Sequence, residues 1–251
     1  MLTRKKMALL APLLAVAFAA LPAWAEVREE FHKSVPMEAN GEFSLKNVNG
    51  SVTISAWDKN EVQIDAVKIA DSEKKLGEAR IEVAGSGHSV DVQTKYPDHA
   101  NNNPAKVEYT IHLPRDARVF SAETVNGGIH IDGPRGRIQA STVNGTAEVW
   151  NAADELELSS VNGDVKASLS NAGKNRVKLS VVNGSVALSL SASANARMKA
   201  STVNGDIHSD LALPVEKSKY APGATLDSTL GSGGATIELE AVNGSIYLHK
   251  R

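Results

Sequence analysis

The hexapeptide "ASTVNG" occurs at residues 140–145 and again at 200–205, and its last three residues recur along the chain. The Val-Asn-Gly triplet is found seven times in 251 residues, beginning at Val48, Val125, Val143, Val161, Val182, Val203 and Val242. The intervals are 77, 18, 18, 21, 21 and 39 residues. The middle four indicate a period of about 20 residues, and the other two are close to multiples of it, as in a repeat array with insertions.

Apolar and polar residues alternate on both sides of the triplet. Five residues before each valine lie Phe43, Phe120, Ile138, Leu156, Val177, Met198 and Ile237, and three before it lie Leu45, Ala122, Ala140, Leu158, Leu179, Ala200 and Leu239. Two residues after each glycine lie Val52, Ile129, Ala147, Val165, Val186, Ile207 and Ile246. Because period-2 alternation is typical of a strand with one buried face, each unit is predicted to be strand, corner and strand, with these columns buried.

Two all-β architectures fit this unit. In an antiparallel meander or barrel, Asn-Gly is the two-residue turn of a hairpin, and Leu45 then pairs with Ile54 on one face. In a single-stranded β-solenoid, each unit of about 18–21 residues makes one coil, and equivalent residues stack on the next coil.

The identity of the corner residues favours the solenoid. A meander accepts any turn-forming pair, whereas in a solenoid the corner amides lie about 4.8 Å apart and can hydrogen-bond as a ladder. The glycine is expected to supply a positive φ at the corner. The predicted corner ladder consists of Asn49, Asn126, Asn144, Asn162, Asn183, Asn204 and Asn243 with Gly50, Gly127, Gly145, Gly163, Gly184, Gly205 and Gly244.

The chain resembles the DUF4097 family, whose members are labelled adhesins. The resemblance is carried by "NVNGSVTISAWDKNEVQIDAVKIA" at 47–70, "YTIHLPRDARVFSAETVNGGIHIDG" at 109–133 and "IELEAVNGSIYL" at 237–248, and it spans roughly residues 40–251. It implies a β-helix-like fold. It brings no catalytic or binding residues with it.

The first 25 residues have the order of a secretory signal peptide. Three basic residues at 4–6 precede an apolar run, and "AWA" at 23–25 predicts cleavage between Ala25 and Glu26. A retained membrane anchor is the alternative, because the apolar run is long enough to cross a bilayer. Cleavage leaves 26–251 as one domain with no further membrane span expected.

Composition narrows the possible functions. Without residues 1–25, 24 of the 27 Lys and Arg remain against 29 Asp and Glu, which gives a net charge of −5. An acidic chain gives no electrostatic reason to expect nucleic acid as a partner. The absence of cysteine excludes disulfides, thiolate metal sites and cysteine nucleophiles.

Two segments interrupt the repeat, at about 71–108 and 213–234. The first is predicted to hold two strands around a Gly-Ser-Gly turn, followed by a loop at 97–106. The second contains turn formers and no sustained alternation. Both are candidate binding loops, since loops on a repetitive scaffold often carry function. The alternative is that they are insertions without a function, which a surface loop tolerates at little cost in stability.

The candidates for metal chemistry are spread through the repeat. His130 and His208 share an outward column but are expected to lie four coils apart, too far for joint ligation. Asp164 and Asp206 follow their glycines in a column of small turn-forming residues, with Ser185 expected between them. No metal or other cofactor is predicted.

Catalysis is the alternative function, because β-helices also host polysaccharide-cleaving enzymes. The acidic candidates are Asp132, Glu148 and Asp164, and the basic candidates are Arg135, Arg137 and Lys166. Nothing in the sequence marks them as a cleft, and an exported solenoid needs outward charges for solubility. Trp57, Trp150 and Tyr247 are a candidate sugar-stacking platform.

The sequence therefore predicts an exported, non-enzymatic β-solenoid of the bacterial periplasm or cell surface. The expected role is an adhesin-like binding or scaffold module for an envelope glycan or protein, and no catalytic residue is assigned. Lys250 and Arg251 are expected to discourage edge-to-edge pairing at the C-terminal end. The oligomeric state is not indicated.

Overall fold

The fold is described from a computed structural model that covers residues 26–97, 104–170, 175–191, 193–217 and 222–251. The predicted signal peptide with Ala25, and residues 98–103 of the predicted loop, lie outside the described residues. Nineteen strands and one helix, α1 (Glu73–Glu78), make up the described part of the chain. No helix in those ranges is long and apolar enough to cross a membrane.

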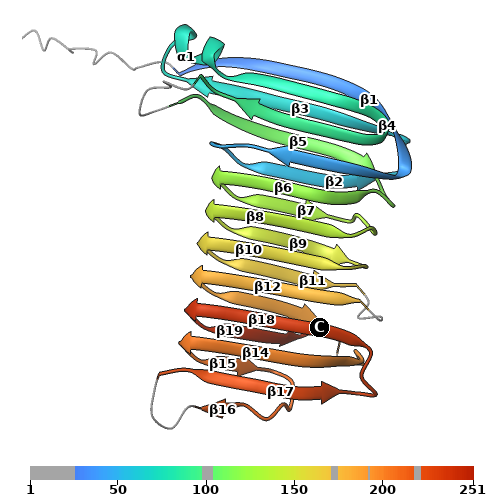
Figure 1. The fold of residues 1–251 in the computed structure, drawn as a ribbon, viewed down its shortest axis with the longest axis vertical. Coiled ribbons are helices and arrows are strands. Elements are labelled where there is room, and N and C mark those ends of the chain that lie inside the picture. The colour runs from blue at the N-terminus through green and yellow to red at the C-terminus, as the bar shows by residue number, and fades with distance from the viewer. Residues whose placement is uncertain (1–25, 98–103, 171–174, 192, 218–221) are drawn as a thin grey trace, which may run out of the picture.

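The strands form two stacked layers that run the length of the molecule (Figure 1). Sheet A contains, in spatial order, the first half of β1 (Val27–Lys46), β3 (Glu61–Ala70), β5 (Lys106–Pro114), β2 (Val52–Trp57), β7 (Ile129–Asp132), β9 (Ala147–Ala152), β11 (Val165–Leu169), β13 (Val186–Leu190), β19 (Ile246–Lys250) and β15 (Ile207–Ser209).

Sheet B contains β4 (Arg80–Lys95), the second half of β1, β6 (Arg118–Asn126), β8 (Ile138–Asn144), β10 (Leu156–Asn162), β12 (Arg176–Asn183), β18 (Ala235–Asn243), β14 (Ala196–Asn204), β17 (Ala224–Leu230) and β16 (Glu216–Lys217). Strand β1 pairs in both sheets, so all nineteen strands are connected by hydrogen bonds.

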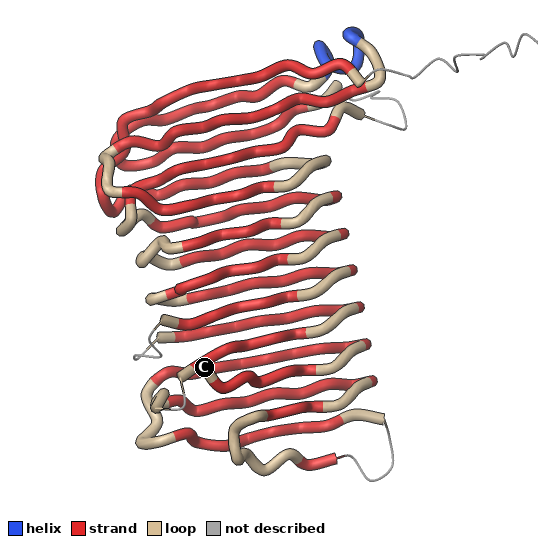
Figure 2. Tube along the Cα trace, turned by 180° about the vertical axis from the view of Figure 1, so that it is seen from behind, coloured by secondary structure: helices blue, strands red, loops and turns tan. Residues whose placement is uncertain are grey.

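The two strands that flank each Val-Asn-Gly corner belong to opposite sheets. Leu45 is in register with Val92 and Ala122 in sheet B, whereas Ile54 is in register with Ile111 and Ile131 in sheet A. The alternative meander, in which Leu45 pairs with Ile54, is therefore wrong. The fold is a β-solenoid, as predicted, with parallel pairing between equivalent strands of successive coils. The corners line one edge of the stack, and more varied turns line the other (Figure 2).

The core lies between the sheets and consists of the apolar columns, with one exception. Phe120 was expected in the buried column but is 54% exposed, and Val119 is buried in its place. The register between β1 and β6 shifts at this point, since Phe43 is opposite Val119 while Ser44 is opposite Ser121. A β-bulge inserts one extra residue and so turns Phe120 outward.

The spatial order of the coils differs from their order in the chain. The last coil, β18 and β19, lies between the β12–β13 coil and the β14–β15 coil, as Figure 1 shows. The first corner coil is also internal, because β2 pairs with β5 on one side and β7 on the other.

Surface charges are consistent with this order. One outward column of sheet B reads, in space, Glu157, Lys178, Glu238, Lys199 and Asp227. Chain order would place Lys178 directly beside Lys199, whereas insertion of β18 puts Glu238 between them. Opposite charges on neighbouring strands are stabilising and like charges are destabilising, so the column favours the observed order.

The two inserted segments supply the end strands of sheet B, whereas sheet A ends in β1 and β15. The first segment supplies α1. The buried side chain of Lys68 holds the end of this helix in place, because Lys68 Nζ donates to the Ala79 carbonyl at 3.2 Å and also lies 2.7 Å from Glu29 Oε1. It also supplies β4, one continuous strand instead of the expected two, with Gly85 and Gly87 at positive φ.

At the other end, the second segment forms β16 and β17, although no sustained alternation was found in its sequence. Strand β17 pairs antiparallel with β14 and covers its free edge. Lys250 and Arg251 therefore do not protect the end of the stack, because β19 is an internal strand.

Candidate functional site

The corner asparagines form one continuous hydrogen-bonded column along the edge of the stack. In each step, Nδ2 of one amide donates to Oδ1 of the amide that precedes it in the column, at 2.7–2.9 Å. The order is Asn49, Asn126, Asn144, Asn162, Asn183, Asn243 and Asn204. The side chains remain exposed, so the corner edge presents a row of aligned amides.

The corner glycines are needed for close packing more than for a positive φ. A Cβ on Gly145 would lie 2.1 Å from the carbonyl oxygen of Gly127 on the next coil, and Gly163 has the same relation to Gly145. Positive φ values occur at Gly50, Gly163, Gly184 and Gly244 but not at Gly127, Gly145 or Gly205. The expectation that every corner requires positive φ is therefore wrong, and the common constraint is a backbone carbonyl of the adjacent coil at the place that a Cβ would occupy.

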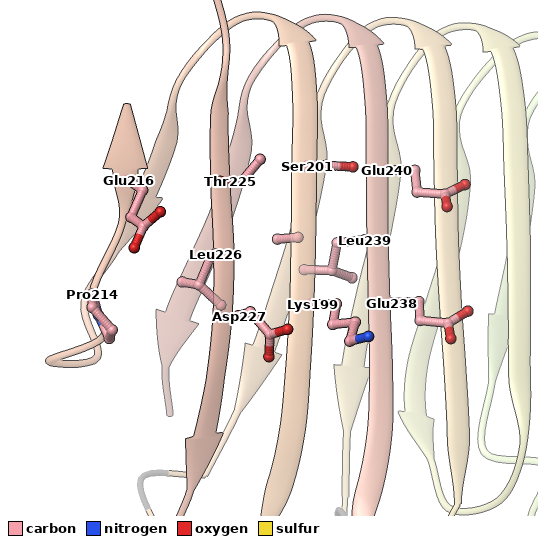
Figure 3. Close-up of a pocket in the computed structure, with 11 residues that line it drawn as sticks. Lys199, Ser201, Pro214, Glu216, Thr225, Leu226, Asp227, Glu238, Leu239 and Glu240 are labelled. Atoms are coloured by element: carbon pink, nitrogen blue, oxygen red, sulfur yellow. The ribbon is translucent and has the colours of Figure 1, made fainter. Parts of the chain in front are cut away.

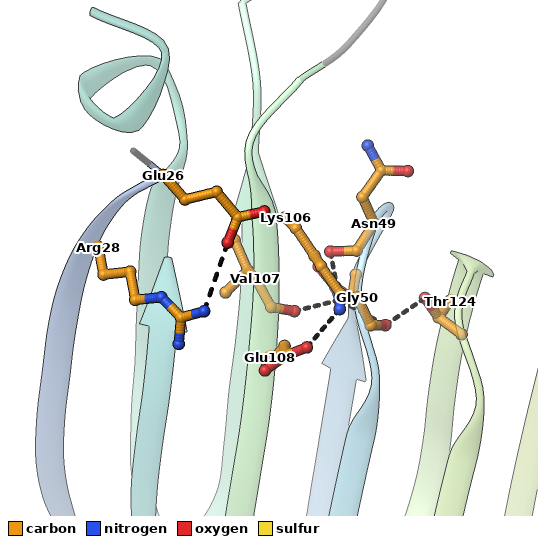
Figure 4. A network of polar contacts seen from close by, with 9 residues as sticks. Glu26, Arg28, Asn49, Gly50, Lys106, Val107, Glu108 and Thr124 are labelled. Carbon is orange, nitrogen blue, oxygen red and sulfur yellow. Dashed lines mark hydrogen bonds and ion pairs between the residues drawn. The ribbon is translucent and has the colours of Figure 1, made fainter. Parts of the chain in front are cut away.

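Hydroxyl side chains lie beside the amides, inside the corner, at four of the seven corners, whereas Val181 and Ala241 occupy the equivalent position at two others. Thr142 Oγ1 donates to the Gly127 carbonyl at 2.8 Å, and Ser160 and Thr202 make the equivalent bond to Gly145 and Gly244. At the first corner, Asn47 replaces the hydroxyl, and its Nδ2 donates to the Val107 carbonyl at 2.9 Å. Figure 4 shows this end of the column, where Gly50 meets Val107 of β5 on one side and Thr124 on the other.

The corner valines form an exposed apolar row. Val125, Val143, Val161, Val182, Val203 and Val242 are 38–59% exposed, whereas the apolar columns on both sides of them are buried. The corner edge thus combines a row of methyl groups with the row of amides.

The histidine and aspartate candidates for metal binding are separated by the fold. Five coil steps, roughly 24 Å at the strand spacing, separate His130 from His208, instead of the expected four, because β19 lies between β13 and β15. Among the described residues, no three His, Asp or Glu side chains are grouped as a metal site.

Asp164 and Asp206 each bind a neighbouring group of the protein. Asp164 Oδ1 accepts from the Ser185 backbone N–H at 2.9 Å and from its Oγ at 2.7 Å, and these bonds lower the pKa of Asp164. Asp206 pairs with Lys217 at 2.8 Å, which lowers its pKa. Both Ser185 and Ser245 lie between the two aspartates, not Ser185 alone.

The carboxylates considered for catalysis do not share one cleft. Glu148 faces His130 at 3.5 Å, and Asp132 Oδ1 accepts from Asn151 Nδ2 at 2.8 Å. Asp164 is at the corner end of β11, about 13 Å along the strand direction from the level of Asp132.

The basic candidates are dispersed as well. Arg135 lies near Asp116 and Arg137 near Glu155, whereas Lys166 is on the outward face of sheet A.

A shallow pocket of about 450 Å³ lies on sheet B beside the C-terminal cap. Figure 3 shows Lys199 between Asp227 and Glu238 on its floor, with Glu216 and Glu240 at the sides. This floor belongs to the alternating charge column, and Glu238 is also paired with Arg176 at 3.0 Å.

The aromatic candidates do not form one platform. Trp57 stacks on His112 with ring centroids 5.3 Å apart, and its Nε1 donates to the Glu61 carbonyl. Tyr247 stacks between His208 and His249 at 5.1 and 6.2 Å. Trp150 is two coils from Trp57 and three from Tyr247.

Trp150 instead lines a groove of about 460 Å³ on sheet A, at the edge opposite the corners. Its ring is 40% exposed. Ser168 and Ser189 lie next to it on the following two coils, and Lys250 and Arg251 complete the lining from β19. We call this site the Trp150 groove. Sequence reasoning missed the part played by Lys250 and Arg251, since these residues reach Trp150 only because β19 stacks on β13.

A two-layer β-solenoid whose coils turn on a shared Asn-Gly column is the class of protein that this fold defines. The chain belongs to the Toastrack DUF4097 family, whose family model matches residues 34–249. No curated protein gave a match.

Several solved structures are similar. A "putative cell adhesion protein" from Clostridium sporogenes is 15% identical with a TM-score of 0.49, covering 90% of this chain and 100% of its own. A "putative adhesin" from Bacteroides fragilis is 14% identical with a TM-score of 0.46, covering 88% and 97%. A "putative lipid binding protein" from Parabacteroides distasonis is 11% identical with a TM-score of 0.34, covering 88% and 95%.

Proposed function

We propose that this protein is an exported, non-enzymatic binding or scaffold module of the bacterial envelope, located in the periplasm or at the cell surface. Its adhesin-like role is to hold an envelope glycan or protein on the outward faces of the solenoid. Export is supported by the basic, apolar and Ala-x-Ala order of residues 4–25.

The observation that carries the proposal is the Trp150 groove. An exposed indole beside serine hydroxyls and cationic side chains offers an apolar surface together with polar groups that can orient a ligand. The lining residues come from successive coils, so an extended ligand can make contacts along the stack.

The test is a screen of the purified full-length protein against envelope polysaccharides and envelope protein extracts, in which binding and product formation are recorded on the same samples. Saturable binding without product supports the proposal. Turnover of any polysaccharide would instead establish the alternative, a polysaccharide-cleaving enzyme on a β-helix scaffold, and would direct mutagenesis to Asp132 and Glu148. Absence of saturable binding across both sets would overturn the binding role.

A further inference from the structure

We propose that the Trp150 groove is a binding site for an anionic saccharide, a chain of sugar rings that carries carboxylate or sulfate groups. This inference rests on the proposed binding function and names the ligand class of its site.

The shape of the groove follows from a bulge in β9. The register between β9 and β11 shifts so that Trp150 and Asn151 together oppose Ser168, and Asn151 takes the left-handed conformation with φ at 59°. A bulge of this kind redirects the neighbouring side chains. A non-glycine residue with positive φ is uncommon, and asparagine is among the residues that adopt it most readily, which suits Asn151 to this bulge.

The floor of the groove is low because its residues are small. Ser168 and Ser189 are paired in register on β11 and β13, and they lie between Trp150 and the end of β19. The hollow that they leave is bounded by the indole on one side and by Lys250 and Arg251 on the other. A sugar ring fits this arrangement, because its C–H face can pack on the indole while its hydroxyls meet the Ser189 hydroxyl and the Asn151 amide. Ser168 is buried and holds Arg251 in place.

The side chains that line the groove carry two positive charges, on Lys250 and Arg251, against one negative charge, on Asp132, and this excess favours an anion. Within the described ranges, neither Lys250 nor Arg251 has a carboxylate within ion-pair distance, although most other basic groups in the described ranges do. Arg251 Nη1 donates to Ser168 Oγ at 3.0 Å, so the guanidinium lies across the floor. The acidic group of the lining, Asp132, accepts from Asn151 Nδ2. A guanidinium with free donors is well suited to binding carboxylate or sulfate.

The length of the surface suits more than one sugar ring. Trp150 and His249 share an outward column and are three coils apart, roughly 14 Å at the strand spacing. Tyr247 stacks against His249, so a second, separate group of aromatic rings lies further along the stack. We therefore expect a short oligosaccharide segment to lie along the stack.

The test uses two pairs of probes matched in backbone and different in charge: polygalacturonate with its methyl ester, and dextran sulfate with dextran. Binding to the purified full-length protein is measured by isothermal titration calorimetry. We expect the charged member of at least one pair to bind at least tenfold more tightly than its neutral counterpart, with affinity falling as salt increases.

Variants separate the groove from the rest of the surface. Trp150→Ala and the double change Lys250→Gln with Arg251→Gln should each weaken binding about tenfold or more. The matched controls are Phe120→Ala, an exposed aromatic on sheet B, and Arg197→Gln, a cation on sheet B, which should leave binding within about twofold. Thermal melts confirm that each variant is folded.

The outcomes distinguish this inference from the proposed function. Binding that is unchanged by the groove variants, or lost equally in the controls, would overturn the groove as the site while leaving the binding function standing. Equal or tighter binding of the neutral probes would overturn the ligand class. Failure of all four probes would overturn the inference, and the screen of polysaccharides and proteins would then decide the broader function on its own.

Discussion

Asn243 donates from Nδ2 to Oδ1 of Asn183 at 2.9 Å, although 60 residues separate them in the chain. Asn204, which is much nearer to Asn183 in sequence, donates instead to Asn243 at 2.8 Å. The last repeat has therefore entered the amide column between two earlier repeats. The column is unbroken at that point because every repeat presents the same side chain at the same corner.

Removing an inner amide should destabilise the fold more than removing a terminal one. Asn162 both donates to Asn144 and accepts from Asn183, whereas Asn204 has a single amide bond, to Asn243. We expect Asn162→Ala to lower the free energy of unfolding by about 1–2 kcal/mol and Asn204→Ala by about half as much. Urea denaturation measures both, and equal losses would show that the column bonds do not contribute in this way.

The glycine column should be the least tolerant part of each corner. A methyl group on Gly145 meets the Gly127 carbonyl at 2.1 Å, and backbone on both sides limits relaxation. Gly145→Ala is expected to reduce the free energy of unfolding by about 3 kcal/mol or more.

The control for this change is Gly77→Ala in α1, where an added Cβ has nothing within 4 Å. This variant should be neutral or stabilised by up to about 1 kcal/mol, because alanine favours a helix over glycine. Denaturation of both proteins gives the comparison, and a tolerated Gly145→Ala would contradict the packing argument.

Charge reversal should destabilise the fold more at Glu238 than at Glu240, although both lie on β18, because only Glu238 is part of the alternating charge column. Glu238 lies between Lys178 and Lys199, so Glu238→Lys would place three cations in a row. We expect a loss of about 1 kcal/mol at low ionic strength, which shrinks as salt is added.

Glu240→Lys is the matched control on the same face. Glu240 lies between Ser180 and Ser201, so reversing its charge creates no like-charge neighbour in its own column. Its unfolding free energy should change by no more than about 0.5 kcal/mol. If the two variants behave alike, the order of charges does not help to place β18.

The ionised carboxylate of Asp164 should stabilise the folded protein at neutral pH and lose this effect in acid. Its hydrogen bonds from Ser185 hold its pKa below the ordinary range in the folded state. A carboxyl with a depressed folded pKa stabilises the fold above its unfolded pKa of about 3.9, and that stabilisation disappears as pH falls through the folded pKa.

Asp164→Asn tests this dependence, because the amide keeps an acceptor oxygen but removes the charge. We expect the variant to be less stable than the parent by under about 1 kcal/mol at pH 7, with the difference shrinking as pH falls below the unfolded pKa of Asp164. Unfolding free energies measured from pH 2 to 7 provide the check, and a difference that stays constant with pH would argue against a role for the charge.

Much of this protein is determined by local pattern. The alternation around each Val-Asn-Gly predicts the strands and their buried faces, because side-chain direction in a strand depends only on position. The identity of the corner residues is what favours the solenoid over a meander. The sevenfold repetition of the triplet predicts a shared corner. These features need no knowledge of which coil lies next to which.

The neighbours of each coil are decided by tertiary structure. The corner and the apolar columns are shared by the repeats, so they do not specify where β18 and β19 stack. Differences between the repeats, such as Glu238 beside Lys178 and Lys199, are expected to contribute to that choice. The stacking of β19 on β13 also brings Arg251 to Ser168 and completes the Trp150 groove. The bulge that turns Phe120 outward could not be predicted from the alternation either, because a single extra residue changes the strand register without changing the composition. Sequence alone thus determined the shape of the coil, whereas long-range pairing determined the order of the coils and, with it, the candidate site.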